Sequence, residues 1–162
     1  TEKDEKIRKG NIKARTRMCY LFDLAHFNQG MVLSTDNLTE LYLGFWTLHG
    51  DVGNYGMLQY LWKTEVYNLA EYLKEMYQNQ GYTKKAHVLD QVINAIPTDG
   101  LGITSSDFDQ IGVNSYQEAD KIIIDYMNGN TRNMNHPIIK RYLSTEFKRR
   151  DPQNIKRESL YS

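Results

Sequence analysis

Hydrophobic residues recur at the spacing of an amphipathic helix along most of this chain. In residues 11–28, for example, Ile12, Met18, Leu21 and Ala25 fall on one side of the predicted helix. The same period returns in five later segments, which polar or glycine-rich stretches separate. The predicted helices are residues 11–28, 35–45, 61–79, 83–97, 115–129 and 135–150.

One short segment, residues 31–34, has the pattern of a buried parallel strand instead. It begins with apolar residues, and Gly30 and polar residues bound it. A polar turn follows, where Thr35 or Asp36 is the expected N-cap of the next helix. A strand, a turn and a helix in this order are typical of α/β proteins. Because one strand makes no sheet, we expect the chain to be the helix-rich part of an α/β domain.

Local signals predict where the later helices begin and end. Pro97 stops one helix, since proline cannot continue it. Ser115 and Glu118 predict a capping box at the start of another. His136–Pro137 predicts the start of the last helix. Two further segments have the composition of loops, residues 50–56 and 98–113.

Composition restricts the class of protein. The chain has 162 residues, enough for one domain with a buried core. Its 20 basic and 20 acidic residues give a formal net charge of zero, so we expect neither a nucleic-acid nor a membrane partner. No apolar run approaches the roughly 20 residues of a membrane helix. The single cysteine, Cys19, excludes an internal disulfide and is expected to be buried in a cytoplasmic protein.

The end of the predicted strand carries the most promising chemistry. Thr35 offers a hydroxyl there, and Asp36 and Glu40 lie one helical turn apart. Open α/β sheets bind ligands where strands end and helices begin, and the free amides of a helix start favour an anion. Phosphate with Mg²⁺ suits such a site, because magnesium takes one or two carboxylates together with phosphate oxygens. Spacing alone favours the simpler interpretation, an N-cap with an acidic first turn.

Other candidates are weaker by themselves. Asp51 and Asn54 in the glycine-rich segment could bind a ribose or an amide, and Lys63 could contact phosphate. Each also has an ordinary structural explanation, such as a turn or a solvated surface lysine. The four histidines show no metal-ligand spacing, and no nucleophile–base pair is suggested.

Taken in order, these segments resemble one family, the ammonia-dependent NAD synthetases and the matching domain of the glutamine-dependent enzymes. The resemblance covers nearly the whole chain. The matching blocks are KGNIKARTRM (9–18), VLSTDNLTELYLGFWTLHGD (32–51), LWKTEV (61–66), IPTDGL (96–101), DQIGVNSYQEAD (109–120) and STEFKRR (144–150).

The resemblance implies an open, Rossmann-like parallel sheet of the adenine-nucleotide α-hydrolase type, usually in a homodimer. It implies a ligase for NAD biosynthesis that uses ATP and Mg²⁺. The carboxylate of deamido-NAD attacks ATP to form an acyl-adenylate and pyrophosphate, and ammonia then displaces AMP. Such a reaction depends on positioning and electrostatics, so no catalytic residue is assigned.

The resemblance also implies roles for individual residues. Thr35, Lys63 and Thr98 match ATP contacts, and Glu40 matches a magnesium ligand. The expected contacts to deamido-NAD are Arg15, Asp51, Asn54, Phe147 and Lys148.

Three departures from the family pattern lie on the side of the acid substrate. Many members have aspartate at Asn54, lysine at Leu48 and histidine at Phe147. A different carboxylic acid is therefore an alternative substrate. The family's pyrophosphate-binding loop, Ser-Gly-Gly followed by Asp-Ser, is absent. We therefore expect residues 1–162 to be the C-terminal part of a single synthetase domain, inactive in isolation and binding ATP weakly or not at all. The alternative is a non-catalytic dimerisation remnant.

Overall fold

The protein is described by a computed structural model over residues 1–98, 104–152 and 154–160. It is a helix-rich α/β structure with a small parallel sheet. None of the helices in these residues is long and apolar enough to cross a membrane. The elements in chain order are α1 (Glu2–Phe27), β1 (Leu33–Ser34), α2 (Leu38–Leu43), β2 (Tyr55–Gly56), α3 (Lys63–Asn79), α4 (Thr83–Asn94), α5 (Asp107–Ile111), α6 (Tyr116–Met127), α7 (Pro137–Ser144), α8 (Glu146–Arg149) and η1 (Arg157–Leu160).

The first strand is shorter than the sequence pattern predicts, and it has a parallel partner that the pattern does not predict. β1 pairs in parallel with β2, with Leu33 opposite Tyr55 and Ser34 opposite Gly56. The expected strand at 31–34 is thus wrong in length and in burial, because Leu33 is 55% exposed and only the preceding Val32 is buried. The prediction of a loop throughout 50–56 is also wrong, since its last two residues form β2.

The hydrophobic core lies among α2, α5, α6 and α7. α6 contributes one buried face, apolar except for Asp120, because its buried residues recur three and four positions apart. Aromatic rings from α2, α3 and α6 pack around this centre. The core consists of Leu43, Ile111, Val113, Tyr116, Ala119, Ile122, Ile123, Ile138 and Ile139.

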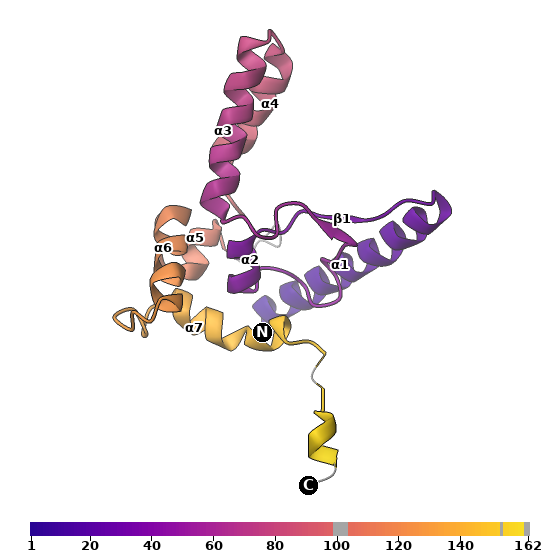
Figure 1. Cartoon of the computed structure of the whole chain (residues 1–162), viewed down its shortest axis with the longest axis vertical. Coiled ribbons are helices and arrows are strands. Elements are labelled where there is room, and N and C mark those ends of the chain that lie inside the picture. Colours follow the sequence, from indigo (N-terminus) through magenta and orange to yellow (C-terminus); the bar gives the residue numbers. More distant parts are fainter. Residues whose placement is uncertain (99–103, 153, 161–162) are drawn as a thin grey trace.

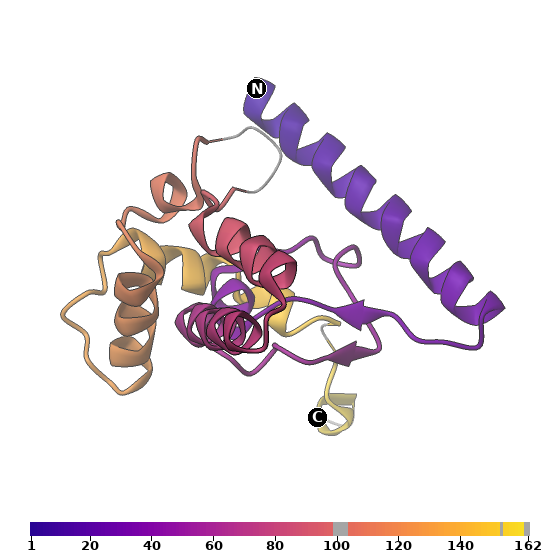
Figure 2. The same cartoon turned by 90° about the horizontal axis from the view of Figure 1, so that it is seen from above.

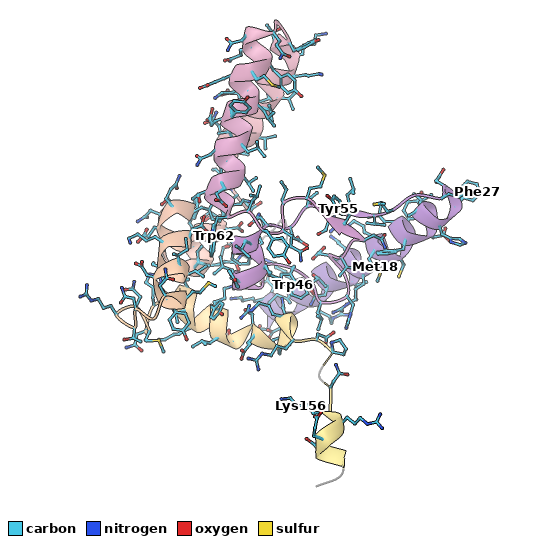
Figure 3. All side chains as sticks on the ribbon, in the orientation of Figure 1. Met18, Phe27, Trp46, Tyr55, Trp62 and Lys156 are labelled. Carbon is cyan, nitrogen blue, oxygen red and sulfur yellow. The ribbon has the colours of Figure 1, made fainter. Side chains whose placement is uncertain are left out.

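Two parts of the chain extend away from this core. α3 and α4 form an antiparallel hairpin that projects from the body, and α1 runs along one side as a single long helix (Figures 1 and 2). Phe27 lies at the outer end of α1, whereas Trp62 lies next to the core where α3 begins (Figure 3). The segment that carries Lys156 leads away from the body (Figure 3).

Helix starts follow the local signals only in part. The N-cap of α2 is Asn37, not Thr35 or Asp36, because Asn37 Oδ1 accepts a hydrogen bond from the Glu40 amide and Glu40 Oε2 accepts one from the Asn37 amide. Ser115 caps α6 as predicted. The reciprocal bond of the expected capping box is missing, since Glu118 accepts from the Asn114 amide instead.

Several segment boundaries also differ from the prediction. α1 begins at Glu2 rather than near residue 11, because i,i+4 ion pairs support a turn with little apolar surface. A short helix, α5, interrupts the predicted loop at 98–113. The predicted last helix breaks at Thr145 into α7 and α8. Cys19 is exposed, so its predicted burial is wrong.

Three cations from α7 and α8 bind the carboxyl end of α2. Arg141 Nε donates to the Leu43 carbonyl at 2.7 Å. Arg149 Nη1 donates to the Tyr42 carbonyl at 2.9 Å. Lys148 Nζ donates to the carbonyls of Gly44 and Trp46. These side chains satisfy carbonyls that have no partner within a six-residue helix, and their charge opposes the negative end of its dipole.

Gly44 allows this close approach. Its φ of 63° lies in the left-handed region, which a side chain disfavours. A Cβ built at this position would lie 2.6 Å from Thr145 Cβ. Only glycine therefore lets α2 end directly against the junction of α7 and α8.

Replacing Arg149 with methionine tests this anchoring. The variant keeps an apolar stem of similar length but leaves the α2 carbonyls without their charged donor, so we expect unfolding to become easier by about 1.5–3 kcal/mol. Urea denaturation measures the change. Arg150→Met is the matched control, because Arg150 makes an exposed ion pair with Glu146, and a change within about 0.5 kcal/mol is expected. Equal effects of the two substitutions would contradict the proposed anchoring.

Candidate functional site

A cleft of about 240 Å³ opens at the carboxyl end of β1. One wall is α1, and the other walls are the segment that leaves β1 and the loop before β2. Thr35 lines this cleft, as the position of the strand predicts, and it is exposed to solvent. The residues around the cleft are Ala14, Arg17, Met18, Leu21, Val32, Leu33, Ser34, Thr35, Asp36, Gly50, Asp51 and Val52.

Asp36 carries the most perturbed charge of the cleft. Its partial burial raises the pKa of the carboxyl, and the negative charges of Glu40 and Asp51 add to this effect. A hydrogen bond of 3.0 Å from Ser34 Oγ acts in the opposite direction, since it favours the ionised form. The surroundings of Asp36 therefore stabilise its ionised form only in part. Carboxylates with such a raised pKa occur in binding sites and also in purely structural sites.

Glu40 and Lys63 form an ion pair, and neither residue is among those that line the cleft. Lys63 Nζ lies 2.7 Å from Glu40 Oε1, and both side chains are 21% exposed. Glu40 Oε2 accepts a bond from the Asn37 amide, so two partners orient this carboxylate. Lys63 Nζ also lies 5.5 Å from the centre of the Tyr116 ring. The structure thus brings together two residues that the sequence separates by 23 positions.

A buried hydrogen-bond network lies next to this ion pair. Thr39 Oγ1 donates to Asp120 Oδ1 at 2.5 Å and accepts the Lys63 amide at 2.8 Å. Asp120 Oδ2 accepts both the amide and the hydroxyl of Thr64, at 3.1 and 2.8 Å. Asp120 is 3% exposed, and Thr39 is fully buried. The network joins α2, the start of α3 and α6.

Asp51 and Asn54 shape the loop between α2 and β2. Asp51 lines the cleft, and its Oδ2 accepts the Thr47 amide at 2.6 Å. Asn54 Oδ1 accepts the Val32 amide at 3.0 Å, so this side chain pins the loop to the segment before β1. Gly53 permits that contact, because a Cβ there would lie 2.6 Å from the Ser34 amide nitrogen. An aspartate in place of Asn54 could accept the same bond.

The arginine on the cleft wall is Arg17. The predicted ligand-binding arginine, Arg15, donates from Nε to the Leu48 carbonyl at 3.1 Å and is not among the residues that line the cleft. Arg17 shares its helix face with Ala14 and Leu21, which lie three and four positions away, and its neighbour Met18 also lines the cleft. This periodicity could have identified Arg17 from the sequence.

The remaining predicted residues lie outside the cleft. Thr98 is exposed beyond the end of α4. Phe147 is 54% exposed on α8. Lys148 is half-buried against the Trp46 ring, and this desolvation, with the charge of Arg141, lowers the pKa of its ammonium group. Within the described part of the chain, Trp46 Nε1 is the one buried side-chain nitrogen or oxygen without a hydrogen-bond partner.

The described residues hold no cluster of three or more His, Cys, Asp or Glu side chains suited to a metal ion. Glu40 nevertheless retains free lone pairs, because each of its oxygens accepts one bond and can accept a second. One carboxylate beside a phosphate group is a donor set that Mg²⁺ accepts. The residues therefore fit a magnesium ion that a nucleotide brings with it, and not a dedicated protein cage.

Sequence comparison points to one family. The family model described as NAD synthase matches residues 1–152. The NH(3)-dependent NAD(+) synthetase of Thermoplasma acidophilum is 35% identical over 153 residues, which cover 91% of this chain and 57% of that protein. The enzyme of the same name from Methanococcus aeolicus is 34% identical over 76% of this chain and 44% of its own length. The chain thus spans about half the length of these curated relatives.

Structural comparison agrees with the sequence match. The structure of NMN synthetase from Francisella tularensis superposes with a TM-score of 0.71 and 28% identity, over 93% of this chain and 57% of that chain. The NH3-dependent NAD synthetase from Campylobacter jejuni, in complex with nitrate, superposes with a TM-score of 0.62 over 93% of this chain and 56% of its own. Its identity of 22% shows a likeness of fold alone.

The raised pKa of Asp36 makes stability depend on pH. Below the ordinary pKa of 3.8 the carboxyl is protonated in both states, and its burial costs little. As the pH rises, the unfolded chain ionises first, so the folded state loses stability until Asp36 has ionised there too. We expect wild type to become less stable relative to Asp36→Asn across this range, as measured by urea denaturation between roughly pH 3 and 7.

Ser34→Ala provides the control for this prediction. It removes the hydrogen bond that favours the ionised carboxylate, so the loss of stability with rising pH should become larger. A wild type that gains stability relative to Asp36→Asn as the pH rises would contradict the assigned burial effect.

Proposed function

Since the chain belongs to the NAD synthase family, we propose that it contributes to an ATP-dependent ligase that converts deamido-NAD to NAD with ammonia. The carboxylate of the nicotinate ring attacks the α-phosphorus of ATP, and the bond to pyrophosphate breaks. Ammonia then attacks the acyl carbon of the adenylate. AMP leaves with the electron pair of the C–O bond, and the amine nitrogen loses a proton as the amide forms.

The ATP side of the proposed site is the region around the start of α2. Thr35 would offer its hydroxyl to a phosphate, and Lys63 would balance the phosphate charge as a compact cation. The observation that supports this assignment most is the 2.7 Å ion pair of Lys63 with Glu40, because Glu40 lies in the first turn of the helix that begins shortly after the cleft residue Thr35. A phosphate that engages Lys63 would release Glu40 from this pairing. We propose that the remaining contact, Thr98, approaches from the end of α4.

Glu40 would hold a magnesium ion, which neutralises phosphate charge when it is bound. The protein residues here position and balance charge rather than attack the substrate. We also propose that β1 and β2 belong to an open Rossmann-like sheet, and that two copies of the enzyme associate as a cytoplasmic homodimer.

The acid side would lie along α1 and the loop that follows α2. Asp51 borders the cleft, and we propose that it binds a ribose hydroxyl. Arg15 and Lys148 already bind loop carbonyls, so they would act first by shaping the loop that receives the acid. Asn54 and Phe147 would complete this side of the site. The unpaired Trp46 Nε1 would supply a further donor close to Lys148.

A second candidate activity uses a mononucleotide as the acid. It is supported by the superposition with the Francisella tularensis NMN synthetase and by the departures at Leu48, Asn54 and Phe147. An enzyme of this kind would amidate nicotinate mononucleotide and form NMN by the same two steps. Both candidates share ATP, Mg²⁺ and ammonia, and they differ only in the acid.

One assay separates the two activities. The gene product that carries this sequence, at its natural length, is incubated with ATP, Mg²⁺ and ammonia, and with either deamido-NAD or nicotinate mononucleotide. We expect NAD from deamido-NAD with a kcat/KM at least about tenfold higher than that for NMN formation. The opposite preference would favour the second candidate. Formation of neither amide, in a folded protein, would refute the proposed function.

Glu40→Gln tests the proposed metal contact. The substitution keeps an oxygen for the Asn37 amide but removes the charge, so we expect pyrophosphate release to fall by more than about tenfold. Raising the Mg²⁺ concentration should recover part of the loss, because a weakened ligand shifts the metal requirement. Glu65→Gln is the control, since Glu65 is exposed and a glutamine there can still accept the hydrogen bond from the Trp62 amide. An unchanged rate in Glu40→Gln would remove Glu40 from the metal site.

A further inference from the structure

We propose that Asp120 and Thr39 are positioning residues for the ATP side of the site. Neither residue lines the cleft, and both are buried. They act by fixing the backbone from which Lys63 and Glu40 extend. The inference rests on the proposed function, because it assigns Lys63 and Glu40 to ATP and its magnesium ion.

The first argument concerns the start of α3. The amides of a first helical turn have no partner within their helix, and an N-cap side chain usually satisfies one of them. The N-cap of α3 is Trp62, whose side chain makes no capping hydrogen bond. Thr39 Oγ1 from α2 accepts the Lys63 amide instead, and Asp120 from α6 accepts the Thr64 amide. Residues of two other helices therefore set where α3 begins.

The second argument concerns Glu40, the acidic partner in the ion pair with Lys63. Glu40 directly follows Thr39 in α2, a helix of only six residues. The bond between Thr39 Oγ1 and Asp120 Oδ1 ties that turn to α6. The carboxylate of Asp120 thus accepts bonds from the residue next to Glu40, which is Thr39, and from the residue next to Lys63, which is Thr64. It therefore fixes the backbone at both partners of the ion pair.

The burial of Asp120 makes each of its hydrogen bonds costly to lose. A carboxylate that is 3% exposed is costly unless its oxygens accept hydrogen bonds, and here three donors supply them. Movement of α3 relative to α6 would break the two bonds from Thr64 to Asp120. Movement of α3 relative to α2 would break the bond from the Lys63 amide to Thr39 Oγ1. The network therefore holds the backbone of Lys63 and Glu40 in a defined relative position before any nucleotide arrives, which lowers the cost of ordering them on binding.

Thr39→Val and Thr39→Ser form the central experiment. Valine keeps the shape of threonine but removes the hydroxyl, so it leaves the Lys63 amide without its acceptor and removes the donor to Asp120 Oδ1, while the two bonds from Thr64 to Oδ2 remain. In the gene product at its natural length, we expect the KM for ATP to rise by about fivefold or more while the KM for the acid stays within about twofold. Serine keeps the hydroxyl and should restore the KM for ATP.

Ser115→Ala is the matched control for simple destabilisation. It removes the N-cap of α6, the helix that carries Asp120, without touching the network. Loss of folded protein lowers the active fraction and hence the apparent kcat, but it does not move the KM for ATP. If Thr39→Val fails to fold, Thr64→Val takes its place, because it removes one bond to Asp120 at a less buried position.

A second readout does not depend on the reaction. The acetylation rate of Lys63 Nζ, measured by mass spectrometry with acetic anhydride, reports how firmly the ion pair is held, and the exposed Lys84 serves as internal reference. We expect the rate at Lys63 to rise severalfold in the folded valine variant, and to stay at the wild-type value in Thr39→Ser and Ser115→Ala. Equal Lys63 rates in Thr39→Val and Ser115→Ala would overturn the inference.

A wild type without amide synthesis but with the expected acetylation pattern would refute the proposed function and leave the positioning network supported.

Discussion

The arrangement of the site depends on one buried carboxylate. Asp120 lies inside the body of the protein, and it is tolerable there only because Thr39 and Thr64 donate hydrogen bonds to it. Those donors belong to α2 and to the start of α3, so the need to satisfy one charge sets the relative positions of three helices. The Lys63–Glu40 ion pair, at 2.7 Å, follows from that geometry.

α2 connects this network to the rest of the fold. Its first turn carries Glu40, and its carboxyl end receives Arg141, Lys148 and Arg149 from α7 and α8. Oppositely charged side chains therefore lie at the two ends of one short helix, each at the end where the helix dipole favours it. This balance explains how a six-residue helix with one capping asparagine can be a fixed reference for the cleft. Lys148, which the family resemblance assigns to the substrate, also has this structural task.

The sequence predicts some of these features well and others poorly. Family membership was predicted from ordered motifs and is confirmed by the match over residues 1–152. Helices with a strong apolar period, such as α3 and α6, lie where they were expected. The start of α1 was missed because ion pairs rather than apolar residues support it, and the exposure of Leu33 was missed because strand burial depends on neighbouring strands. Contacts across long separations, such as Thr39 with Asp120, leave no local pattern at all.

Amide hydrogen exchange, followed by nuclear magnetic resonance, tests the role of the Asp120 network most directly. The backbone amides of Lys63 and Thr64 stand at the first turn of a helix, where amides normally exchange fast for want of an internal partner. The account predicts that both are protected by about a hundredfold or more, since they donate to Thr39 Oγ1 and Asp120 Oδ2. Exchange of both amides at the rate of an unstructured peptide, in an otherwise folded protein, would contradict it.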